Sequence, residues 1–89
     1  MPAISMFFGI IIQILFYDNK EHKSPHIHAR YGEFLASFDI STGEILGGTM
    51  PPKQTRLILA WIEIHRDELN ADWLLAVEGK EIFKIDPLK

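Results

Sequence analysis

Three of the four histidines of this chain fall within one short segment, residues 21–30, together with a lysine and an arginine. The segment reads Glu-His-Lys-Ser-Pro-His-Ile-His-Ala-Arg, and polar and apolar residues alternate after its proline. An alternation with a period of two is typical of a half-buried strand. We therefore expect His26, His28 and Arg30 to project from one polar face, and any chemistry to lie on that face.

The first chemistry that this segment suggests is metal binding. His22, His26 and His28 have the spacing of a three-histidine site, and neutral imidazole binds zinc or another transition metal. Histidines two apart on a strand point the same way, and His22 can reach them from the preceding loop. Asp39 or Glu33 could orient the ligands or complete the set. The plainer alternative is that His26 and His28 are only the outward polar positions of an amphipathic strand.

The second chemistry is recognition of RNA or another phosphate. The cations available for it are Lys23, Arg30, Lys53 and Arg56. A helix start after Gly47-Gly48 would add free N–H groups. His26 or His28 could act as a catalytic general acid or base, with Asp39 opposite His26 fixing its tautomer. The order of His-bearing strand, second strand, turn and helix is similar to that of small HicA-type RNase toxins. Alternatively, these cations form a solvated rim, and a net charge of -3 argues against non-specific coating of nucleic acid.

A third interpretation is a protein-interaction module without catalysis. The segment Ile10–Tyr17 is rich in β-branched and aromatic residues and is apolar on both faces except at Gln13. A strand of this kind needs cover on both sides. The N-terminal residues, a second subunit or a partner protein could supply the second cover, so a homo-oligomer is one expectation.

Length and composition limit the class of protein. A chain of 89 residues forms a single domain, 1–89, and it contains no cysteine for disulfides or thiolate metal sites. The apolar run Met6–Phe16 is too short to span a bilayer as a helix, and it lacks the basic start of a signal peptide. We expect a soluble cytoplasmic protein without membrane contact.

The pattern of elements predicts strands followed by helices. After the first strand, His26–Tyr31 and Phe34–Ile40 are expected to form a hairpin, with a short strand from Ile45 to about Thr49. A type II′ turn at Gly32-Glu33 would pair Tyr31 with Phe34 and His26 with Asp39. A turn at Tyr31-Gly32 is the competing arrangement, and it would slide the pairing by two residues.

The second half of the chain carries a helical stripe. Its members recur every three or four residues: Ile58, Ile62, His65, Leu69, Trp73 and Ala76. Two segments, about Pro52–His65 and about Asp67–Glu78, are favoured, although one bent helix fits the stripe as well. Gly79 is expected to end the helix, and Glu81–Ile85 could add an edge strand.

These elements predict an α+β fold, a small antiparallel meander of three to four strands followed by two helical segments packed on one face. The expected core contains Ile12, Ile14, Phe16, Ile27, Phe38, Ile62, Leu69 and Trp73. Trp61 and His65 are also expected to pack in this core, rather than to act as a stacking platform and a metal ligand.

The chain resembles a family of small prokaryotic proteins known as domain of unknown function 4160. The residues that carry the resemblance are Pro2, Ile4, Ser5, Phe7, Gly9, Ile10, Glu21, His22, Pro25, His26, Ile27, His28, Ala29, Gly32, Glu33, Asp39, Thr42, Gly43, Glu44, Trp61, His65, Leu69, Trp73, Pro87 and Leu88. The Pro-His-x-His-Ala element is the most specific of them. The sequence departs from the family pattern at Lys23-Ser24, where Asn-Pro is expected, and at Asp72, where Asn is usual.

The resemblance implies no established biochemical activity. It implies a small partner protein encoded nearby, an arrangement similar to a toxin–antitoxin or related two-gene module. On this basis we expect one component of such a module, which contacts RNA through its His- and Arg-bearing strand.

Overall fold

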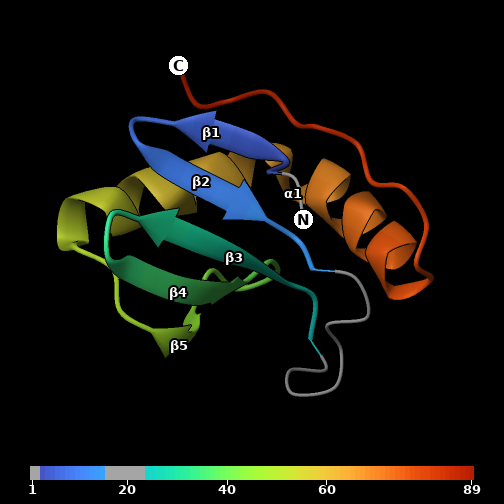
Figure 1. Cartoon of the computed structure of the whole chain (residues 1–89), viewed down its shortest axis with the longest axis horizontal. Coiled ribbons are helices and arrows are strands. Elements are labelled where there is room, and N and C mark those ends of the chain that lie inside the picture. The colour runs from blue at the N-terminus through green and yellow to red at the C-terminus, as the bar shows by residue number, and fades with distance from the viewer. Residues whose placement is uncertain (1–2, 16–23) are drawn as a thin grey trace.

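The computed structural model describes residues 3–15 and 24–89, and these form a sheet with one long helix behind it (Figure 1). Its elements are β1 (Ser5–Phe7), β2 (Ile10–Gln13), β3 (His26–Tyr31), β4 (Phe34–Asp39), β5 (Ile45–Gly48) and α1 (Pro52–Val77). The strands pair in chain order, each antiparallel to the next. The predicted α+β class is therefore confirmed, whereas the predictions for Phe16, Tyr17, His22 and Lys23 lie outside the described residues.

The number of strands was underestimated. Ser5–Phe7 forms an additional edge strand that pairs with β2, because Phe8 and Gly9, both at positive φ, close a tight hairpin turn. A strand of three residues is too short to show an alternating pattern. The edge strand predicted for Glu81–Ile85 is absent from the described part of the chain. There the tail makes one backbone contact with the sheet region, from the Ile85 N–H to the Ile4 carbonyl at 2.8 Å.

The helical region is one helix with a kink, not the two segments that the sequence favoured. The break lies at His65, whose φ of -111° and ψ of 20° are non-helical. The halves on either side bury the same stripe, so the helix resumes after a single distorted residue. Gly79, at φ 74°, ends it as predicted, with the N–H of Lys80 donating to the Leu75 carbonyl at 2.8 Å.

The hairpin of β3 and β4 has the predicted register. Tyr31 lies opposite Phe34, and His26 lies opposite Asp39, as the Gly32-Glu33 turn requires. Gly32 has a φ of 58°, as expected for the first central position of a type II′ turn. The competing Tyr31-Gly32 turn is excluded.

The core lies between α1 and one face of the sheet. All of its predicted members that the structure describes are buried: Ile12, Ile14, Ile27, Phe38, Ile62, Leu69 and Trp73. Trp61 is fully buried among them, and the ring of His65 packs 5.5 Å from it. The prediction that both tryptophans belong to the core is confirmed. Within the described residues, no helix is both long enough and apolar enough to cross a bilayer.

The opposite face of the sheet points away from α1 (Figure 1). Strand alternation and the pairing register place His26, Asp39 and eight further residues on this side. His26 and Asp39 are buried, and the other eight are Met6, Ile11, Gln13, His28, Arg30, Leu35, Ser37 and Gly47. We call this set the open face. It is the surface on which the sequence predicted chemistry, and α1 reaches this side of the sheet at Trp73, which packs against His26.

Candidate functional site

The open face is organised in two rows that cross the strands. One row, Met6, Ile11, Arg30 and Leu35, is apolar apart from its arginine. The next row, Gln13, His28, Ser37 and Gly47, is polar and ends at a residue without a side chain. Facing residues in adjacent strands are the pairs that interact directly. The polar row is therefore the part of the sheet where neighbouring polar side chains can hydrogen-bond with one another and act on the same ligand.

A hollow of about 310 Å³ lies at the end of the polar row. It is lined by His28, Leu35, Ala36, Ser37, Gly47 and Gly48. It exists because Gly47 contributes no side chain, and a Cβ placed there would meet nothing within 4 Å. The hollow can therefore accept one side chain or a small group of a ligand beside the imidazole of His28.

His28 and Ser37 form the polar pair of this hollow. The Ser37 Oγ lies 3.3 Å from the Nδ1 of His28, and both residues are half-buried. A hydroxyl can donate to or accept from an imidazole nitrogen, so this contact suits either tautomer of the ring. A partly exposed imidazole is the side chain best suited to proton transfer near neutral pH.

His26 lies on the same side of the sheet as His28 and Arg30, as expected, but it is not exposed. Its side chain is fully buried, with its ring 4.8 Å from that of Trp73 and 5.2 Å from that of His28. Its Nδ1 donates to the carbonyl of Ser24 at 2.8 Å, because a carbonyl oxygen only accepts. The ring is thus held by Ser24 and by the helix, and His26 is a packed histidine that supports His28.

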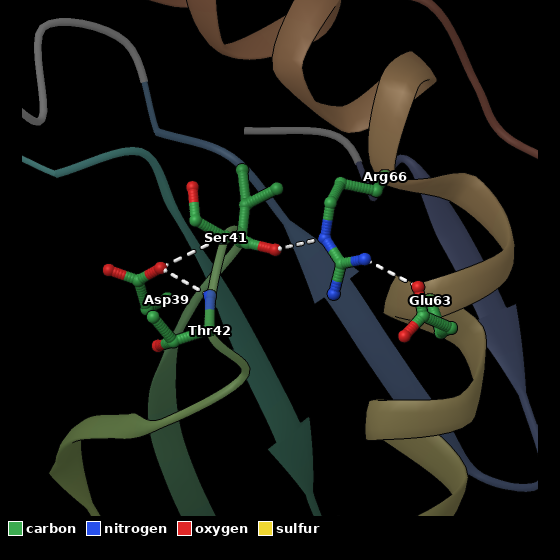
Figure 2. A network of polar contacts seen from close by, with 6 residues as sticks. Asp39, Ser41, Thr42, Glu63 and Arg66 are labelled. Carbon is green, nitrogen blue, oxygen red and sulfur yellow. Dashed lines mark hydrogen bonds and ion pairs between the residues drawn. The ribbon is translucent and has the colours of Figure 1, made fainter.

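Asp39 lies opposite His26 in the register, but its carboxylate acts elsewhere (Figure 2). The Oδ1 accepts the backbone N–H groups of Ser41 at 2.8 Å and Thr42 at 2.9 Å. This is the bonding of an Asx-type turn after β4. The next carbonyl, that of Ile40, accepts the Nε–H of Arg66 at 2.9 Å and so ties the turn to α1. Asp39 therefore orders the turn, and the tautomer of His26 is fixed by Ser24 instead.

The cations expected to bind phosphate do not share one layer. Arg30 is exposed on the open face. Lys53 and Arg56 are exposed on α1, the helix that covers the opposite face, and Lys23 lies outside the described residues. The structure therefore places one of the predicted cations beside His28.

The three-histidine metal site stays a prediction because His22 lies outside the described residues. Within residues 3–15 and 24–89, no group of three histidine, aspartate or glutamate side chains is arranged to hold a metal ion. His26 and His28 do lie side by side, as a site of this kind requires.

No role was assigned to Ser37 from the sequence. The signal was nevertheless present, since the register of the Gly32-Glu33 turn places Ser37 opposite His28. Leu35 was missed for a different reason: an exposed apolar side chain on a strand gives no chemical signal in a single sequence.

A buried carboxyl outside the open face holds the C-terminal segment. Asp72 is 2% exposed, and its Oδ1 accepts the N–H of Phe83 at 3.0 Å, while its Oδ2 lacks a hydrogen-bond partner among the described residues. Burial raises the pKa of Asp72; the hydrogen bond from Phe83 opposes this shift and repulsion by Glu68 adds to it.

We expect Asp72→Asn to stabilise the protein at pH 7 by on the order of 1 kcal/mol, since the amide can fill the same position without a charge. A carboxyl whose pKa is raised on folding favours the folded state below its unfolded pKa. That contribution is lost as the pH rises through the folded pKa. The difference in free energy of unfolding between Asp72→Asn and the native chain, measured by urea unfolding, should therefore become smaller as the pH falls from 7 to 4. Asp67→Asn, an exposed change on the same helix, is the control. A gain that does not depend on pH would contradict this explanation.

Comparison with known proteins gives one match. No curated protein and no solved structure matches the chain. The model of a family described as "Domain of unknown function (DUF4160)" matches residues 9–74. This range contains β2 to β5, the whole polar row and most of α1. The match covers well over half of the chain, and the protein therefore belongs to the DUF4160 family.

Proposed function

We propose that this protein is one component of a two-protein, toxin–antitoxin-like module, and that the open face is its working surface. The observation that carries the proposal is the hollow beside Gly47, in which the His28–Ser37 pair lies partly exposed. The sequence resemblance to chains encoded beside a small partner gene supports the two-protein arrangement.

RNA is the target that fits this surface in the proposed module. His28 and Arg30 project from the same strand, so an acid–base group and a cation stand next to each other. A guanidinium can bind a phosphate while the imidazole transfers a proton. The buried ring of His26 lies edge-on beside that of His28, with ring centroids 5.2 Å apart. In this proposal His28 is the acid–base residue, Ser37 positions its ring, and His26 packs beside it on the same strand.

The test is growth after induced expression of the chain, of the neighbouring gene, and of both together. We expect one of the two proteins to arrest growth and co-expression to relieve the arrest. His28→Gln should abolish the effect of this chain, because glutamine can hydrogen-bond with Ser37 but cannot titrate. If the chain cleaves RNA, the same variant should lower the cleavage rate by at least about 10²-fold.

His65→Ala is the matched control, since it removes a histidine from α1 and leaves the open face unchanged. Both variants must unfold at a temperature close to that of the native chain. The proposal would be abandoned if neither protein affected growth and the two did not bind each other.

A further inference from the structure

The apolar row of the open face has the composition of a docking surface. The side chains of Met6 and Leu35 are 63% and 53% exposed, and Ile11 lies half-buried between the strands that carry them. These residues come from three different strands, and the register aligns them across the sheet. Large apolar side chains gathered on one exposed surface mark an interaction site more often than isolated ones do.

Arg30 stands in the middle of this apolar row. It is exposed, with Ile11 opposite on one side and Leu35 opposite on the other. None of the ion pairs among residues 3–15 and 24–89 includes it. The carboxylate that the described strands place on the same side is Asp39, which is buried and already engaged in the turn. The row therefore offers one positive charge framed by apolar side chains.

We propose that this row binds a segment of the partner protein in which a carboxylate is flanked by apolar side chains. The carboxylate would pair with Arg30, and the flanking groups would cover Met6, Ile11 and Leu35. A second side chain of the same segment would enter the hollow at Gly47, which lies two residues farther along the strands, roughly 7 Å away. This inference rests on the proposed two-protein module and names where and how its partner binds.

The charge pattern of the row favours such a partner over a second copy of the chain. A second copy of the chain offers no exposed carboxylate from the described strands of this face, so the guanidinium would again lack a counter-charge. In the proposed module an RNA phosphate would use the same guanidinium, so RNA and the partner segment would compete for Arg30. Lys53 and Arg56 lie on α1 behind the sheet and add no charge to this row. A protein segment with a carboxylate and apolar side chains matches both the positive charge of Arg30 and the apolar side chains around it.

The experiment measures binding of the neighbouring gene's product to the purified full chain by titration calorimetry. We expect Arg30→Glu to weaken binding by roughly 100-fold and Leu35→Ser by roughly 10-fold, since charge reversal adds repulsion to the lost contact. The matched controls are Lys84→Glu and Leu74→Ser, which make the same changes at exposed positions on the C-terminal tail and on α1. Each control is expected to change the affinity less than threefold. A partner carboxylate whose change to lysine restores binding to Arg30→Glu would identify the pair directly.

Three outcomes would overturn the inference. If the neighbour's product binds all four variants equally well, the docking site is wrong but the two-protein module stands. If it does not bind the native chain at all, both proposals fail. If Arg30→Glu abolishes binding to total transfer RNA and leaves the protein partner bound, the row is an RNA surface.

Discussion

Phe38→Ala is expected to lower the free energy of unfolding by about 3–5 kcal/mol. Phe38 is fully buried on β4, where it lies opposite Ile27 and faces the core beneath α1. Truncation removes the buried ring and leaves a cavity that the neighbouring strands cannot fill. A loss of this size is a large part of the roughly 5–15 kcal/mol by which small domains are stable.

Urea unfolding followed by tryptophan fluorescence measures this loss, because both Trp61 and Trp73 are buried in the same core. The control is Phe83→Ala, which truncates the same side chain where it is 70% exposed, and it should cost less than about 1 kcal/mol. Equal losses in the two variants would mean that the sheet does not pack on α1 as described.

The parts of the fold that the sequence predicted are those determined by residues close together in the chain, such as turns, strand alternation and helix ends. The β3–β4 hairpin followed from an alternating pattern on each side of a glycine-containing two-residue turn, and its register was correct to the residue. The ends of α1 followed from Pro52 and Gly79 in the same way, because proline suits a first helical position and glycine a left-handed cap.

The expectations that differ from the structure concern what surrounds a strand residue, whether that neighbour is distant or close in the sequence. His26 was assigned to the solvent because it alternates with apolar neighbours, but Trp73 from the far half of α1 covers it. Asp39 was assigned to His26 from the register, but the backbone of its own turn takes its Oδ1. Alternation tells which side of a strand a residue occupies; it does not tell what packs on that side.

Because burial and local hydrogen bonds engage two of the three residues, the candidate catalytic site reduces to one histidine. Of the catalytic residues named from sequence, His28 keeps both partial exposure and a polar neighbour, while His26 and Asp39 are engaged in holding the strand and its turn. His26→Ala would therefore disturb packing as well as any chemistry. His28 is the histidine whose substitution can be interpreted as a test of function.

The hollow beside His28 depends on two adjacent glycines with different roles. Gly48 has a φ of 81°, and a Cβ there would lie 2.1 Å from the carbonyl oxygen of Leu35. The same carbonyl accepts the N–H of Thr49 at 3.0 Å, so the contact cannot relax unless β5 moves away from β4. Gly47 has neither constraint, and a Cβ there would enter open space.

Gly48→Ala is therefore expected to destabilise the protein by on the order of 3 kcal/mol, from the strained backbone and the lost pairing of β5. Gly47→Ala should change the free energy of unfolding by less than about 1 kcal/mol, while it narrows the hollow beside His28 and Ser37. Urea unfolding separates the two variants, and the growth assay then shows whether the hollow is used. A folded Gly47→Ala protein without effect on growth would assign function to the hollow. Equal stability of the two variants would instead show that β5 does not pair with β4 at Gly48.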